Sequence, residues 1–146
     1  MSSVDLIIDA PVGAIWAVLA DARSYSLWVV GAKDIRDVEG PWPEPGSKFH
    51  HTLGMGPLTL QDNTKSLALD EGRYLSIEAR ARPLGRARVD FVLSPSNGGT
   101  TVTIKETFVS PPLMRMFNPL FAPLIRGRNV QTLRRLANVV RTSAAT

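Results

Sequence analysis

The regular alternation of polar and apolar residues in the middle of the chain constrains its fold more than any other feature. Between residues 32 and 109 this two-residue period recurs in segments of strand length. Turn-forming stretches separate the segments, most clearly Gly54-Met55-Gly56-Pro57, Pro83-Leu84-Gly85 and Asn97-Gly98-Gly99. The pattern predicts six strands, over residues 32–39, 47–53, 58–69, 73–81, 86–94 and 100–109.

The segments that flank these strands add one strand and the helices. Residues 4–9 alternate weakly and predict one more strand, and a helix follows from Pro11, since proline suits the first helical position. Residues 22–28 predict a second short helix or a turn, and a long helix is predicted to begin near Pro123. Its inner line comprises Ile125, Asn129, Leu133, Leu136 and Val140, in which Asn129 is the polar exception, and the other side carries Arg128, Arg134, Arg135 and Arg141.

This order of elements predicts an α+β fold. A seven-stranded antiparallel sheet with one apolar face would curl around the long terminal helix, with two short helices after the first strand. The space between sheet and helix would then be core or cavity. The length of 146 residues fits a single domain over residues 1–146.

Composition excludes several classes of site. The chain has no cysteine, so disulfides and thiol nucleophiles are absent, and two adjacent histidines alone do not predict a metal site.

No acidic residue follows Glu106, whereas six arginines do. We interpret these arginines as the solvated face of the helix, and we expect neither a nucleic-acid partner nor stable membrane insertion. The N-terminal segment lacks the pattern of a signal peptide, so a cytoplasmic location is expected.

The motifs resemble those of the START-like (SRPBCC) superfamily with its helix-grip fold, and more narrowly those of the bacterial polyketide cyclase/dehydrase family. The resemblance rests on "DAPVGAIWAVLAD" (residues 9–21), Trp28, "PGSKF" (45–49), "GGTTVTIKE" (98–106) and "RNVQTLRRLA" (128–137). It implies a deep hydrophobic pocket between the sheet and the terminal helix. It does not fix an activity, because related proteins include carriers, receptors and cyclases.

Strand alternation predicts which ionisable groups face that pocket. In residues 47–53, Phe49, His51 and Leu53 share the apolar face, so His51 points inward and His50 outward. The same rule turns Asp62 and Glu106 inward. A turn at Met55-Gly56 would place His51 opposite Leu60, with Asp62 as its diagonal neighbour.

His51, Asp62 and Glu106 are therefore candidate catalytic residues, each with a structural alternative. His51 could bond a backbone carbonyl, Asp62 could reach water, and Glu106 could lie at the pocket rim. Glu106 has no inward basic partner on the neighbouring predicted strands, so it should have a raised pKa or bind a polar ligand group.

The sequence thus predicts a protein, monomeric or homodimeric, that binds a hydrophobic small molecule without a cofactor. The alternative is a cyclase or dehydratase that uses His51 or Glu106 as acid or base, with Asn129 as a hydrogen-bond donor. A role for the arginine-rich helix face with RNA or an anionic membrane is a third hypothesis. The predicted ligand contacts are Trp28, Phe49, His51, Leu60, Ile77, Phe91, Glu106, Phe108, Phe117, Phe121, Ile125, Asn129 and Leu133.

Overall fold

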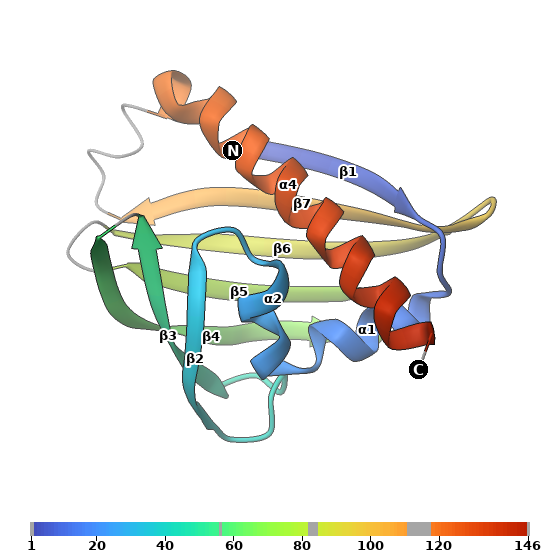
Figure 1. Cartoon of the computed structure of the whole chain (residues 1–146), viewed down its shortest axis with the longest axis horizontal. Helices are drawn as coiled ribbons and strands as arrows, with labels where there is room; N and C mark the ends of the chain where they lie inside the picture. The colour runs from blue at the N-terminus through green and yellow to red at the C-terminus, as the bar shows by residue number, and fades with distance from the viewer. Residues whose placement is uncertain (1, 56, 82–84, 111–117, 146) are drawn as a thin grey trace.

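A single seven-stranded antiparallel sheet forms the frame of the protein (Figure 1). The computed structural model describes residues 2–55, 57–81, 85–110 and 118–145. The strand order is β1-β7-β6-β5-β4-β3-β2, so the strands from β2 to β7 are neighbours in chain order and β1 joins the sheet beside β7. The strands are β1 (Ser2–Ile8), β2 (Ala32–Glu39), β3 (Lys48–Met55), β4 (Leu58–Asp70), β5 (Tyr74–Ala81), β6 (Gly85–Ser96) and β7 (Gly99–Ser110).

The helices lie on one face of this sheet. α1 (Val12–Leu19), the 3-10 helix η1 (Ala22–Ser24) and α2 (Tyr25–Trp28) follow β1 directly, and α4 (Asn118–Ala145) crosses the sheet diagonally (Figure 1). Pro11 precedes α1, where its missing N–H costs no helical hydrogen bond. The α+β helix-grip fold predicted from the sequence is confirmed.

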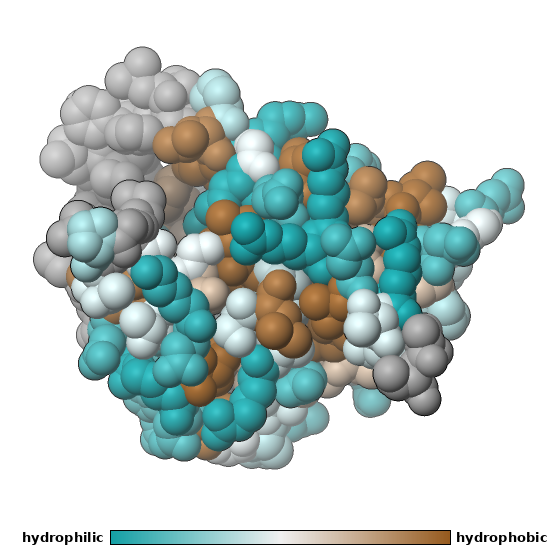
Figure 2. Space-filling model, viewed as in Figure 1, coloured by the Kyte–Doolittle hydropathy of each residue, from teal (hydrophilic) through white to brown (hydrophobic). Residues whose placement is uncertain are grey.

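The terminal helix is longer than the sequence pattern predicts. It begins at Asn118, five residues before the expected start at Pro123, because its second residue Pro119 also suits a first turn. Its inner line is buried as predicted, and its exposed side is largely hydrophilic (Figure 2). The buried residues of this line are Ile125, Asn129, Leu133, Leu136 and Val140.

Alternation along the strands divides the sheet into two different faces. The face toward α4 is buried, and at its centre Leu75 pairs with Phe91, which pairs with Ile104. The residues one position along each strand, Ser76, Asp90 and Lys105, belong to the outer face. The hydrophobic core therefore lies between the inner face of the sheet and the helices.

The β3–β4 hairpin has a register that differs from the expected one by two residues. Met55 pairs with Leu58, which places residues 56 and 57 in the connection, rather than a turn at Met55-Gly56. His51 consequently pairs directly with Asp62, and Leu60 pairs with Leu53. The expected pairing of His51 with Leu60 is therefore wrong.

Candidate functional site

A cavity of about 420 Å³ lies between the inner face of the sheet and the helices α2 and α4. Closely packed protein interiors leave few voids larger than a water molecule, so a space of this size is a distinct feature of the core. Apolar side chains make up most of the described lining. Eight of the predicted ligand contacts line it: Trp28, Phe49, His51, Ile77, Phe91, Glu106, Phe108 and Asn129.

The other predicted contacts lie elsewhere. Leu60 is half-buried and does not line the cavity, whereas its cross-strand partner Leu53 does. Ile125 and Leu133 are buried in the core without reaching the cavity. Phe117 lies outside the described residues, and of Phe121 only the helical backbone is described.

Aromatic rings form one end of the cavity wall. Tyr25 contacts Trp28 and Phe49 with ring centroids 4.5 and 5.0 Å apart, and Trp28 meets Phe91 edge to face at 5.7 Å. Their polar atoms are satisfied by other groups: the Tyr25 hydroxyl donates to the Leu19 carbonyl at 2.7 Å, and Trp28 Nε1 donates to Ser24 Oγ at 3.1 Å. Burial raises the pKa of the Tyr25 hydroxyl, so this group stays protonated. The aromatic end is therefore an apolar wall.

Glu106 is a carboxylate that lines the cavity, and its hydrogen-bond partners come from α4. Its Oε1 accepts hydrogen bonds from the Arg128 guanidinium and, at 3.0 Å, from Asn129 Nδ2. Arg128 also donates to Asn129 Oδ1 at 3.3 Å. The Glu106 side chain is only 4% exposed, so these contacts offset the cost of burying its charge.

Arg128 is a charged site residue that the sequence pattern does not predict. Its backbone lies on the exposed side of α4, as predicted, but its guanidinium turns inward to Glu106. A long flexible side chain next to the inner line of a helix can reach into the core, and helical periodicity does not reveal this. The isolated inward carboxylate of Glu106 is the only signal that could have indicated such a partner. Thr64 and Thr132 also line the cavity and are absent from the predicted contacts.

His51 lines the cavity from β3 and is only 2% exposed. Neither ring nitrogen has a hydrogen-bond partner among the residues that the structure describes. Burial lowers the pKa of His51; the nearby Asn63 backbone and Asp62 oppose this shift, and Arg36 and His50 add to it. The imidazole is therefore neutral at neutral pH, and both ring nitrogens are shielded from solvent.

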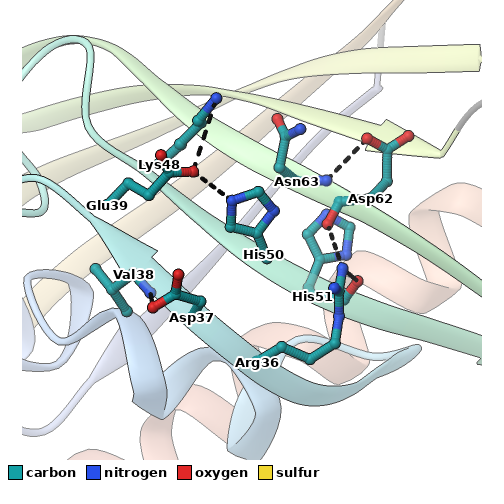
Figure 3. Close-up of polar contacts among 9 residues, drawn as sticks. All are labelled: Arg36, Asp37, Val38, Glu39, Lys48, His50, His51, Asp62 and Asn63. Carbon is teal, nitrogen blue, oxygen red and sulfur yellow. Dashed lines mark hydrogen bonds and ion pairs between the residues drawn. The ribbon is translucent and has the colours of Figure 1, made fainter.

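Asp62 is buried beside His51 but forms no hydrogen-bonded dyad with it. Its Oδ1 accepts from the Asn63 backbone N–H at 2.9 Å, and its carboxylate does not bond the His51 ring. The Arg36 guanidinium donates to the carbonyls of both His51 and Asp62, at 3.1 and 3.2 Å (Figure 3). Asp62 does not line the cavity. His51 and Asp62 are therefore directly opposite each other on paired strands, but their side chains are not hydrogen-bonded to each other.

His50 lies on the opposite face of β3, as predicted. Its Nε2 contacts a carboxylate oxygen of Glu39 on the outer face of the sheet (Figure 3). Within the described ranges, no three His, Asp or Glu side chains are grouped closely enough to hold a metal ion. The same part of the chain contains no helix long and apolar enough to cross a membrane.

Comparisons with known proteins agree with this architecture. The family described as "Polyketide cyclase / dehydrase and lipid transport" matches residues 2–141. No curated protein matches the chain. Among solved structures, protein NE0264 from Nitrosomonas europaea is 17% identical with a TM-score of 0.75, over 99% of this chain and 96% of that one.

Two further structures have similar folds at low identity. Ara h 8.0201 is 16% identical with a TM-score of 0.72, over 96% of both chains. The KanY protein is 16% identical with a TM-score of 0.68, again over 96% of both chains. At such identities these similarities establish the fold alone.

Proposed function

Because the chain belongs to the polyketide cyclase/dehydrase and lipid transport family, we propose that it binds a hydrophobic small molecule of lipid, polyketide or aromatic type. The cavity is the observation that carries this proposal. Its volume of about 420 Å³ falls within the range of roughly 300–1,000 Å³ of small-molecule sites. Its lining combines a large apolar surface with a few polar groups, which is typical of such sites.

The polar groups suggest how the ligand is oriented. Glu106, Arg128 and Asn129 form a polar cluster where β7 faces α4, and the rings of Trp28 and Phe91 belong to the apolar wall. We expect the ligand to place its apolar part against the rings and a polar group at the cluster. This arrangement needs no chemical step.

Native mass spectrometry of the protein purified from its own host tests the proposal. We expect a mass above that of the polypeptide, and its loss after extraction with organic solvent. Ala87→Phe, which adds a ring on the cavity side of β6, should be purified without the extra mass. Thr103→Phe makes a similar addition on the outer face of β7 and should retain it. If only the polypeptide mass is found and the neutral dye N-phenyl-1-naphthylamine does not bind, the proposal is wrong.

A cyclase- or dehydratase-type reaction is the second candidate, and His51 is the observation that favours it. A buried polar group without a partner costs about 1–3 kcal/mol, so its presence calls for an explanation such as catalysis. A neutral imidazole beside a ligand could act as a general base, provided that the ring turns a nitrogen toward the cavity. Incubating the extracted ligand with wild type and with His51→Phe separates the two functions. An enzyme loses turnover and retains binding in the variant, whereas a carrier shows no turnover in either protein.

A further inference from the structure

The three arginines in the described lining of the cavity, Arg80, Arg86 and Arg128, all have carboxylate partners. Arg80 Nε lies 2.8 Å from Glu78 Oε1 and Arg86 Nη1 lies 3.7 Å from Glu78 Oε2, at the end of the lining formed by β5 and β6. Glu78 is on the outer face of the sheet, so these two pairs belong to the rim. The inner pair is Glu106 with Arg128. A ligand at this cluster therefore meets one negative and one positive charge that already neutralise each other.

The two members of the inner pair differ in what they can still offer. The hydrogen bonds that Glu106 accepts from Arg128 and Asn129 both use Oε1, which leaves the second carboxylate oxygen, Oε2, to accept from a ligand. An ionised carboxylate can only accept hydrogen bonds. The guanidinium of Arg128, with its side chain 42% exposed, is partly hydrated and already donates to Glu106 and Asn129. Within this pair, the less exposed member is therefore a hydrogen-bond acceptor.

Resting on the proposed function, we propose that this cluster selects an uncharged ligand with a terminal hydrogen-bond donor of the hydroxyl class and rejects carboxylates. A ligand hydroxyl can donate to Glu106 Oε2, and a hydrogen bond to a charged acceptor is stronger than one between neutral groups. A ligand carboxylate would bring a second negative charge to a buried site where the Arg128 cation is already paired with Glu106. An ammonium group would meet the Arg128 guanidinium. The neutral group is favoured over both ions.

Three ligands with the same ten-carbon chain test this selectivity: 1-decanol, decanoate and decylammonium. At about pH 7 the acid and the amine are both ionised. Affinities are measured by displacement of N-phenyl-1-naphthylamine, an uncharged dye. We expect wild type to bind decanol at least about 10-fold more tightly than decanoate, from the usual strength of a hydrogen bond to a charged group.

Two substitutions that each remove one charge of the pair should change the preference in opposite directions. Glu106→Gln keeps an oxygen for Asn129 and leaves Arg128 as an unpaired cation, so decanoate should gain about 10-fold relative to decanol. Arg128→Gln leaves Glu106 as an unpaired anion, so decylammonium should gain relative to decanol. Glu39→Gln makes the same exchange on the outer face and should leave the order of affinities unchanged.

The outcomes distinguish this inference from the proposal on which it rests. If the ligands bind wild type and neither substitution changes their order, the cluster does not select the polar group and the inference is wrong. The same holds if wild type prefers decanoate. If neither the dye nor any ligand binds wild type, the proposed function fails as well. Should Glu106→Gln not fold, the Arg128→Gln result decides, because a merely structural pair would not create a preference for an ammonium group.

Discussion

The two faces of the sheet use charged residues in different ways. On the outer face Arg88 contacts Asp90 at 3.2 Å, and Glu39 contacts His50 and Lys48, all of them partly or fully exposed to water. On the inner face the paired carboxylate of Glu106 is 4% exposed. Water replaces a lost partner on the outer face at little cost, whereas a buried group depends on its protein partners. A polar group on the inner face should therefore have a larger effect on stability or on a ligand than one on the outer face.

Removing a ring from the inner face should have the largest effect on stability. Phe91→Ala deletes a buried side chain that packs edge to face on Trp28, so the free energy of unfolding should fall by about 3–5 kcal/mol. Val92→Ala, its half-buried neighbour on the outer face, should cost less than about 1.5 kcal/mol. Urea denaturation of the two variants measures both values. Equal losses would mean that the two faces are not packed differently.

Removing the inner cation should have the next largest effect. Arg128→Ala leaves the buried Glu106 carboxylate with Asn129 as its described partner, so the unfolding free energy should fall by about 1–3 kcal/mol. Arg135→Ala, an exposed position on the same helix, should change it by less than about 0.5 kcal/mol. Denaturation curves at low and high salt complete the comparison. A loss that salt removes equally in both variants would place Arg128 among the ordinary surface charges.

Replacing His51 with an apolar ring should stabilise the protein. His51→Phe removes two buried nitrogens that have no hydrogen-bond partner in the described part of the chain, and it retains a ring beside Phe49, so the unfolding free energy should rise by about 1 kcal/mol. The matched change His50→Phe removes the contact with Glu39 on the outer face and should not stabilise the protein. A loss of stability in His51→Phe would show that the imidazole makes a favourable interaction in the native state.

The pH dependence provides a second measurement of His51. Burial lowers its pKa in the folded state below the ordinary value of 6.5, so below pH 6.5 the unfolded state binds more protons. Stability should therefore fall as the pH decreases from 6.5 to the lowered folded pKa, and then stop falling from this cause. His51→Phe should remove this slope, and His50→Gln should retain it. Thermal denaturation between about pH 4 and 7 measures the slope.

The sequence predicts the fold well because the fold depends on periodicity. The two-residue period identifies the buried face of β3, with Phe49 and His51 inside, and helical spacing identifies the inner line of α4. These patterns hold because apolar groups must leave water, whatever their exact partners. A turn shifted by one position is sufficient to move a register by two, and for this reason Asp62 rather than Leu60 faces His51.

The candidate site is less predictable because it depends on where long side chains end. Periodicity places the backbone of Arg128 correctly and does not indicate the contact of its guanidinium with Glu106. The same limit applies to Glu39, whose contact with His50 depends on the β2–β3 register and its bulges. A partner that lies across several strands or on another helix has no local signal in the sequence.

The Glu39–His50 contact should have the smallest effect, and it tests the outer face directly. The hydrogen bond from His50 lowers the pKa of Glu39 below its ordinary 4.5, so the contact contributes stability above pH 4.5 that is lost as the pH falls through the folded pKa. Glu39→Gln should therefore reduce the melting temperature slightly at neutral pH and leave it unchanged at low pH, where wild type has lost the contact too. Asp37→Asn is the matched control, because it removes a charge from the same strand. In wild type the Asp37 carboxylate accepts a hydrogen bond from the Val38 N–H and not from a histidine. High salt should reduce the effect of Glu39→Gln, because both partners are in contact with water. A large, salt-insensitive loss would instead make this outer pair equivalent to Glu106 with Arg128, and the difference between the two faces would then come from packing alone.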